Sequence, residues 1–275
     1  MDAEKYLLLM AIGFGTGAYG TLIGAGGGFV LMPVLLLMYP QESPERLTSI
    51  SLAVVFFNAL SGSEAYARMK RIDYRSGFLF ALATIPGAVI GALHTASVHR
   101  EAFNVIFGVL LLAAALFLFF RPRLKVVSPE KGNHSVHVLE RHLVEADGVQ
   151  YDYRFNPWIG LVLSFFVGYL SSFLGIGGGI IHVPGLVYFL HFPVHVATAT
   201  SHFILAVMAL AGTIVHIVTG TFSHGVHRTV ALAIGVLLGA QLGARLSNRI
   251  QGNWIIRSLG VALGLVGIRI LMLVF

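Results

Sequence analysis

The sequence predicts an all-α, polytopic integral membrane protein made of two inverted repeats, each with one broken (re-entrant hairpin) helix and three spanning helices. Three observations predict this fold. Of the 275 residues, 56% are hydrophobic and only 11% are charged, which is too few to cover a soluble domain. The apolar residues form long blocks, and the pattern of one half of the chain recurs in the other half.

Composition also excludes several classes of function. The chain has no cysteine, which excludes a disulfide framework, an iron–sulfur cluster and a cysteine nucleophile. The formal net charge is +6, but most Lys and Arg residues lie in short loops between apolar blocks, as in the cytoplasmic loops of membrane proteins. We therefore expect membrane lipid as a partner and no nucleic acid.

Six apolar blocks have the length of a spanning helix, because a hydrocarbon core about 30 Å thick needs roughly 20 helical residues. These blocks are Thr48–Ala67, Gly77–Ala96, Ala102–Phe120, Val196–Thr219, Thr229–Leu246 and Ile255–Phe275. Glycine pairs at helical spacing, Gly87/Gly91 and Gly235/Gly239, predict close packing of helices in both halves of the chain.

Two further blocks are too long for one crossing. Leu7–Tyr39 and Trp158–Leu190 each contain 33 residues, about 50 Å as a single helix. A glycine run interrupts each block, and 11 residues follow it, Phe29–Tyr39 and Ile180–Leu190. Eleven helical residues measure about 16 Å, roughly half of the hydrocarbon core. We expect a hairpin in each block: one helix enters, the glycines turn the chain, and a half-helix returns.

The two broken blocks are copies of each other. Four glycines and a proline recur at a constant offset of 151 residues: Gly24, Gly26, Gly27, Gly28 and Pro33 match Gly175, Gly177, Gly178, Gly179 and Pro184. At an offset of 150, Thr48 and Ser51 match Thr198 and Ser201. We therefore expect membrane repeats at 1–120 and 157–275.

The polar stretch 121–156 between the repeats is expected to be a cytoplasmic insertion. Val136–Val144 and Val149–Phe155 alternate partly between apolar and polar residues, and Asp147-Gly148 between them is a turn signal. This pattern predicts a small β-hairpin, and an unstructured linker is the alternative.

Loop charge predicts the orientation in the membrane. Basic residues concentrate in 68–75, 121–125 and 245–257. If both broken blocks fold back, all three regions fall on one side, which the positive-inside rule assigns to the cytoplasm. The repeats then have opposite orientations, as in many secondary transporters. We expect a multi-pass protein of the cell inner (plasma) membrane with loops 68–75, 121–156 and 245–257 cytoplasmic.

The glycine turns predict an anion-binding site. Each half-helix begins at a turn, and a helix N-terminus carries free N–H groups and partial positive charge. Hydroxyl side chains begin the next helix in each repeat, where they donate to a bound anion or, alternatively, only cap the helix. The expected substrate-binding residues are Gly26, Gly27, Gly28, Thr48, Ser49, Ser51, Gly177, Gly178, Gly179, Thr200 and Ser201.

Two histidines, His182 and His202, break the symmetry of the repeats, because Leu31 and Leu52 occupy the matching positions. Imidazole can carry a proton near neutral pH, and ionisable groups inside a membrane are functional candidates. We include both histidines among the substrate-binding residues, with a structural role as the alternative.

The sequence gives little support for metal binding, ATP binding or enzymatic catalysis. The spacing of His191/His195 and His224/His227 suits metal ligands, but the predicted topology places these pairs on opposite membrane faces. No Gly-x-x-x-x-Gly-Lys motif and no nucleophile–base pairing is recognisable. We expect no enzymatic activity, no cofactor and no resident metal.

The doubled pattern GAGGGFVLMP (24–33) and GIGGGIIHVP (175–184), followed in each repeat by a Thr/Ser run, resembles the TauE/SafE sulfite-exporter family. The resemblance covers nearly the whole chain except 121–156. It implies a multi-pass inner-membrane transporter of sulfur-containing anions, such as sulfite or sulfonates, often in export. It also implies that the glycine turns and the Thr/Ser runs line the site, but it does not extend to the histidines.

Together, these observations predict a secondary transporter of a small sulfur-containing oxyanion, coupled to protons, with a homodimer left open. One alternative is an uncoupled anion channel or facilitator with the same site. Another is a divalent-metal carrier, which requires His182, His202 and His216 to converge.

Overall fold

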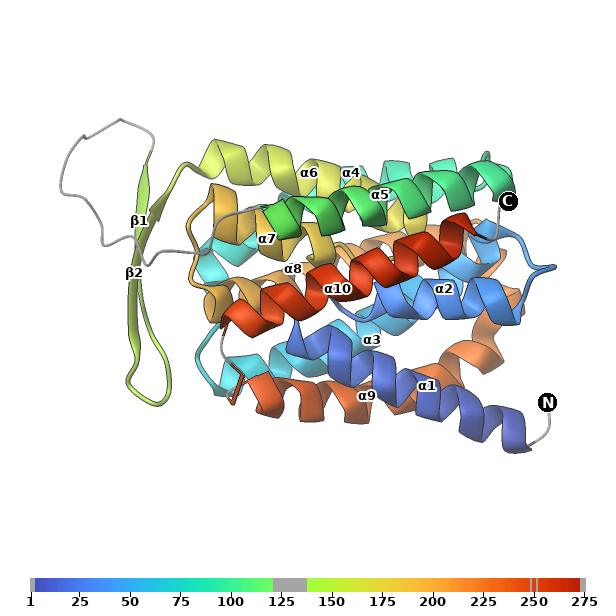
Figure 1. Ribbon diagram of the computed structural model, residues 1–275, viewed down its shortest axis with the longest axis horizontal. Helices are drawn as coiled ribbons and strands as arrows, with labels where there is room; N and C mark the ends of the chain where they lie inside the picture. The colour runs from blue at the N-terminus through green and yellow to red at the C-terminus, as the bar shows by residue number, and fades with distance from the viewer. Residues whose placement is uncertain (1–2, 121–137, 248, 251, 273–275) are drawn as a thin grey trace.

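The computed structural model describes residues 3–120, 138–247, 249–250 and 252–272, which form a helical bundle with one strand pair (Figure 1). The first half of the chain contains α1 (Ala3–Leu22), α2 (Gly28–Met38), α3 (Pro44–Arg68), α4 (Tyr74–Thr95) and α5 (Arg100–Phe120). The second half contains α6 (Pro157–Leu174), α7 (Gly179–Phe189), α8 (Val194–Val218), the short 3₁₀ helix η1 (Thr221–Gly225), α9 (Val226–Ser247) and α10 (Gly252–Leu271). The strands are β1 (Leu139–Val144) and β2 (Gln150–Phe155).

Six helices in the described part of the chain are long and apolar enough to cross a membrane: α3, α4, α5, α6, α8 and α9. Five of them coincide with predicted blocks, and α6 is the first part of a broken block. The remaining predicted block, Ile255–Phe275, lies largely in α10. The chain is therefore a multi-pass membrane protein that is mostly helical.

Each broken block forms two helices joined by a glycine-rich turn. The second helices, α2 and α7, have 11 residues each and begin one residue before the predicted half-helices. The start of α2 packs on the last turns of α1, because a Cβ atom added to Gly27 would lie 2.6 Å from the carbonyl oxygen of Thr16. In Figure 1 the N-terminus and the loop that follows α2 lie at the same end of the bundle.

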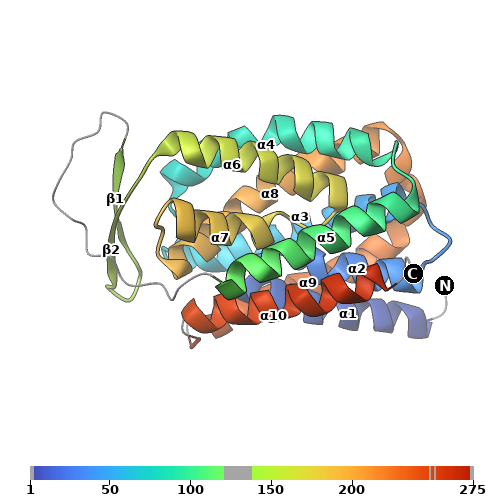
Figure 2. The same ribbon diagram turned by 45° about the horizontal axis from the view of Figure 1, so that its top comes forward.

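Helices of the first half pack on helices of the second half. α1 packs on α9 and α4 packs on α6, while α3 contacts α8 and α5 contacts α10 (Figure 2). Glycines make the first two contacts close: a Cβ at Gly91 or Gly239 would lie 2.2 Å from the carbonyl oxygen of Tyr169 or Phe14. The packing role predicted for these glycines is confirmed.

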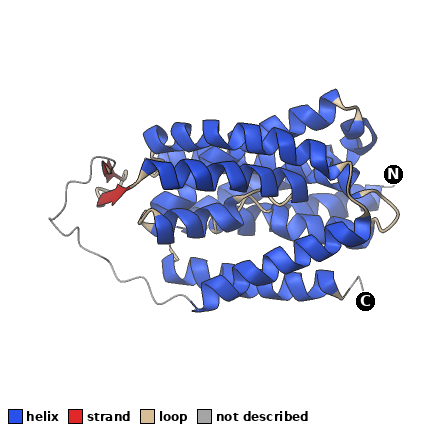
Figure 3. Cartoon of the chain, turned by 90° about the horizontal axis from the view of Figure 1, so that it is seen from above, coloured by secondary structure: helices blue, strands red, loops and turns tan. Residues whose placement is uncertain are grey.

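The strand pair lies outside the helical bundle, at one of its ends (Figure 3). β1 and β2 are antiparallel, with Leu139 opposite Phe155 and Val144 opposite Gln150. Both strands belong to the polar stretch between the predicted repeats. Residues 121–137 of that stretch lie outside the described residues, including the start of the predicted strand at Val136.

Candidate functional site

The two glycine turns, 24–28 and 175–179, are buried and lie against each other. A Cβ added to Gly179 would lie 2.1 Å from the carbonyl oxygen of Gly24, and one added to Gly28 would lie 2.7 Å from that of Ile176. Gly24 and Gly175 also have φ angles of 76° and 67°, which other residues rarely adopt. Glycine is therefore required both for the turns and for their contact.

Crossed hydrogen bonds join each turn to the other half of the chain. The Ser51 hydroxyl, on α3, donates to the carbonyl oxygen of Gly175 over 2.5 Å. The Ser201 hydroxyl, on α8, donates to the carbonyl oxygen of Gly24 over 3.3 Å. Ser51 and Ser201 are matching positions of the two repeats, and so are Gly24 and Gly175. The same bond therefore occurs twice around the paired turns.

Thr48 and Thr198 contribute two buried hydroxyl groups without a partner. A Cβ at Gly175 would lie 3.2 Å from Cγ2 of Thr48, and one at Gly24 would lie 2.8 Å from Cγ2 of Thr198. Both side chains are at most 1% exposed, and neither Oγ1 atom has a hydrogen-bond partner within the described ranges of the chain. Since buried polar groups are nearly always hydrogen-bonded, this matched pair leaves two hydroxyl groups near the turns that could bond a polar ligand.

The N-termini of α2 and α7 adjoin the same turns. The first N–H groups of a helix have no acceptor within the helix, and together they carry partial positive charge. At the start of α7 two of these groups are already bonded: the Gly178 N–H donates to the Ser171 hydroxyl and the Gly179 N–H donates to the Gly177 carbonyl oxygen, each over 2.5 Å. The paired turns thus combine backbone donors with hydroxyl groups, a chemistry suited to an oxyanion.

Two of the predicted site residues lie in other surroundings. The Ser49 hydroxyl donates to the Arg46 carbonyl oxygen in its own helix. The Thr200 hydroxyl accepts from the backbone N–H of Asp73, at the start of α4, over 3.0 Å. The structure therefore brings together Gly26–Gly28, Gly177–Gly179, Thr48, Ser51 and Ser201, and it adds Thr198 and Ser171.

The two histidines of the predicted site have different neighbours. His202, on α8, lies 3.1 Å from the Thr21 hydroxyl at the end of α1. His182, on α7, lies 3.1 Å from the Ser164 hydroxyl on α6. Both rings are fully buried. Among the described residues, no group of three or more His, Cys, Asp or Glu side chains could hold a metal ion.

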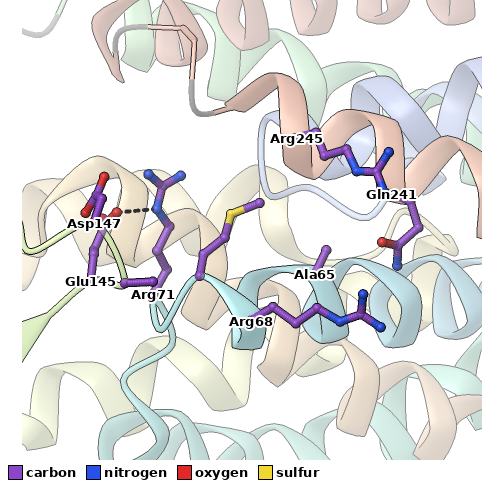
Figure 4. A pocket seen from close by; sticks show the side chains of 9 residues that line it. Ala65, Arg68, Arg71, Glu145, Asp147, Gln241 and Arg245 are labelled. Carbon is purple, nitrogen blue, oxygen red and sulfur yellow. Dashed lines mark hydrogen bonds and ion pairs between the residues drawn. The ribbon is translucent and has the colours of Figure 1, made fainter.

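A pocket of about 230 Å³ opens at the end of the bundle that holds the strand pair (Figure 4). Its charged residues come from three segments: Arg68 ends α3 and Arg71 follows it, Arg245 lies on α9, and Glu145 and Asp147 lie in the turn of the strand pair. The three segments predicted to be cytoplasmic therefore meet at one place.

Buried polar bonds hold the strand pair on this end of the bundle. Arg71 Nε lies 2.6 Å from Glu145 Oε2, and both side chains are less than one-tenth exposed. The Tyr153 hydroxyl donates to the Asp73 carboxylate over 2.8 Å. Burial, together with that carboxylate, raises the pKa of Tyr153, so Tyr153 stays a neutral donor. Because Asp73 also bonds to Thr200, this network reaches α8 one residue before Ser201.

Residues 9–270 match the family model described as "Sulfite exporter TauE/SafE". The chain is similar to the "Probable membrane transporter protein YunE" of Bacillus subtilis (strain 168), with 30% identity over 273 residues that cover 97% of each chain. A "Probable membrane transporter protein" of Methanocaldococcus jannaschii is 24% identical over 219 residues, 78% of this chain and 73% of the relative. One from Xylella fastidiosa (strain Temecula1) is 26% identical over 182 residues, 66% of this chain and 61% of the relative. No solved structure matches the chain.

Proposed function

Since the chain belongs to the sulfite exporter TauE/SafE family, we propose that it is a secondary transporter of a small sulfur-containing oxyanion, of the sulfite or organosulfonate class. The observation that carries the site is the matched pair of unpartnered hydroxyl groups, Thr48 and Thr198, beside the paired glycine turns. The oxyanion lies at these paired turns and accepts hydrogen bonds from the threonines and from those N–H groups in the first turns of α2 and α7 that have no acceptor within the protein.

Such a site suits a small oxyanion for physical reasons. Burying an ion is costly unless hydrogen bonds replace its hydration shell. Sulfite and sulfonate groups carry three oxygen atoms, each able to accept several hydrogen bonds. Hydroxyls and helix N-termini supply donors around the anion without a fixed positive charge, so binding stays weak enough for release on the far side.

Two inverted repeats, 1–120 and 157–275, give this transporter its alternating access. Support comes from the reciprocal helix contacts: α1 packs on α9 as α6 packs on α4, and α3 contacts α9 as α8 contacts α4. In each repeat the first helix and the half-helix form a re-entrant hairpin, and the two glycine turns meet inside the membrane. Rocking of one repeat against the other then exposes the anion to each side in turn.

The protein lies in the inner membrane with the strand pair and its pocket in the cytoplasm. The meeting of Arg68, Arg71 and Arg245 at one end of the bundle supports this orientation. Transport is coupled to protons, for which His202 is the candidate carrier because it is ionisable, buried and close to the first glycine turn. An uncoupled facilitator is the rival, and proton flux measured together with anion flux in vesicles separates the two.

Thermal unfolding of the purified protein with a panel of anions tests the proposed substrate class. The panel contains sulfite, thiosulfate, methanesulfonate, sulfate, chloride and acetate. A ligand that binds only the folded protein raises its stability by mass action, by about 2.7 kcal/mol at 100 times Kd. We expect sulfite or methanesulfonate to raise the unfolding temperature and chloride and acetate to leave it unchanged. Equal shifts with every anion, or no shift with any, would contradict the proposal.

A further inference from the structure

A second group of buried polar side chains adjoins the first glycine turn. Thr21, at the end of α1, lies between Asn58 on α3 and His202 on α8. Its hydroxyl donates to Asn58 Oδ1 over 3.2 Å and lies 3.1 Å from His202 Nε2. All three side chains have no exposed surface. The Tyr66 hydroxyl donates to the Thr21 carbonyl oxygen over 2.7 Å, which fixes the end of α1.

The amide nitrogen of Asn58 has no hydrogen-bond partner among the residues that the structure describes. It lies 3.7 Å from the position that a Cβ atom of Gly27 would occupy, and Gly27 is the N-cap of α2. An unpaired buried N–H donor typically costs about 1–3 kcal/mol, so folded proteins rarely retain one without a reason. Here the unpaired donor stands next to the positive end of a half-helix. Two kinds of donor therefore meet in a buried place, an arrangement that suits an acceptor such as an oxyanion.

When His202 carries its proton on Nε2 and donates to Thr21, the Thr21 hydroxyl donates to Asn58 and sets the direction of the amide. Because the Thr21 hydroxyl bonds to the oxygen Oδ1, the nitrogen Nδ2 points toward the Gly27 turn. His202 holds Thr21 from the other side. Thr21 and His202 therefore position Asn58 and need not touch a ligand themselves.

The matching place in the second repeat is less polar. Ser172, Met208 and Leu52 occupy the positions that correspond to Thr21, Asn58 and His202. Met208 and Leu52 offer no hydrogen-bond donor. Ser172 keeps a buried hydroxyl without a partner among the described residues, but the second turn has no counterpart of the Asn58 amide.

We propose that Asn58 is a direct ligand of the transported oxyanion and holds it closer to the Gly27 turn, with Thr21 and His202 as positioning residues. This inference rests on the proposed function. It adds to the symmetric site one asymmetric donor, which determines where the anion is bound and contributes to the selection of oxyanions over chloride and acetate.

Two substitutions test this inference in proteoliposomes that contain the full-length protein and take up radiolabelled sulfite. Asn58→Asp keeps the shape of the side chain but replaces the donor with an acceptor and a negative charge. Asn58→Met introduces the residue of the matching position, Met208, and removes the donor without adding charge. We expect KM for sulfite to rise by about 10-fold in Asn58→Met, because one hydrogen bond to the anion is lost. We expect uptake to be lost in Asn58→Asp.

Asn104→Asp is the matched control, because Asn104 is also buried but lies on α5, which packs on α10. We expect this variant to keep the KM of the wild type. A wild-type KM in Asn58→Met would overturn the inference, even if Asn58→Asp is inactive, because charge repulsion alone explains that loss. A lower kcat at unchanged KM would assign Asn58 to helix packing. Absence of sulfite uptake by the wild type would instead overturn the proposed function, and the inference with it.

Discussion

At the scale of single residues, Thr48 and Thr198 are the most informative positions in the site. Neither hydroxyl has a hydrogen-bond partner in the part of the chain that the structure describes, so replacing either threonine with the isosteric valine removes an unsatisfied buried polar group. We expect Thr48→Val and Thr198→Val to raise the free energy of unfolding by about 1 kcal/mol while lowering the stabilisation by sulfite. Thermal unfolding with and without sulfite measures both effects.

Thr213→Val is the control for this pair, because the Thr213 hydroxyl is buried but donates to the Ala209 carbonyl oxygen of its own helix. It should leave the response to sulfite unchanged. Loss of stability without a change in the sulfite response at Thr48 and Thr198 would show that these hydroxyls serve the fold and not the ligand.

Replacing Ser51 or Ser201 should lower the free energy of unfolding, the opposite of the effect expected at Thr48 and Thr198. Each serine donates to a carbonyl oxygen of the glycine turn in the other half of the chain. Ser51→Ala leaves the Gly175 oxygen buried without a donor, so we expect the free energy of unfolding to fall by about 1–3 kcal/mol. Thermal unfolding compares this variant with Thr48→Val, three residues earlier. Equal stability changes in the two variants would contradict the different roles assigned to them.

The sequence spacing of the hydroxyl residues predicts which of them face the glycine turns. Residues three apart lie on one face of a helix, so Thr48 and Ser51 face the same turn, and so do Thr198 and Ser201. Ser49 lies on another face of the helix and bonds within it. The Asn58 environment could not be predicted, because it depends on how the end of α1 meets α3 and α8, helices far apart in the sequence.

At the scale of elements, the helix pairs α1–α9 and α4–α6 depend on backbone contact. A Cβ at Gly239 would lie 2.2 Å from the Phe14 carbonyl oxygen, and relief requires the two helices to move apart. Gly239→Ala should therefore destabilise the protein by about 1–3 kcal/mol. At Gly15, also helical, an added Cβ meets nothing within 4 Å, so Gly15→Ala should be neutral or stabilising. Thermal unfolding of both variants tests this, and similar losses of stability would contradict it.

The strand pair depends on the buried ion pair of Arg71 and Glu145. Arg71→Met leaves the Glu145 charge buried alone, which typically costs about 3–5 kcal/mol, so we expect the strand pair to detach from the bundle. The rate of proteolysis between β1 and β2 reports that detachment. Adding Glu145→Leu should restore protection, because an apolar pair of similar size replaces the ion pair. Asp152→Asn, which breaks an exposed pair with His142, should not change the rate.

Lengths and repeats in the sequence predict the helices well, since a hydrocarbon core fixes how long an apolar helix must be. The 11-residue helices α2 and α7 follow from the glycine runs and the length of each broken block. The docking of the strand pair could not be predicted in this way. It depends on the bonds of Arg71 to Glu145 and of Tyr153 to Asp73. The two members of each pair are distant in the sequence, and nothing in the sequence distinguishes them from other polar loop residues.

At the scale of the whole molecule, the orientation in the membrane can be tested directly because the chain has no cysteine. Single cysteines at Gln41 and Asp147, both exposed, mark the two ends of the bundle. In intact cells a membrane-impermeant maleimide should label Gln41→Cys but should label Asp147→Cys only after the membrane is permeabilised. The reverse pattern would place the basic loops outside and contradict the proposed orientation.

The most direct test of the central claim, that the paired glycine turns carry a sulfur oxyanion across the membrane, is the exchange of sulfite in proteoliposomes. Purified protein is reconstituted, the vesicles are loaded with unlabelled sulfite, and the uptake of radiolabelled sulfite is followed. Our account predicts uptake that saturates, accelerates when sulfite is inside, and weakens in the double variant Thr48→Val/Thr198→Val. Uptake no faster than in protein-free vesicles, or uptake that the double variant leaves unchanged, would contradict it.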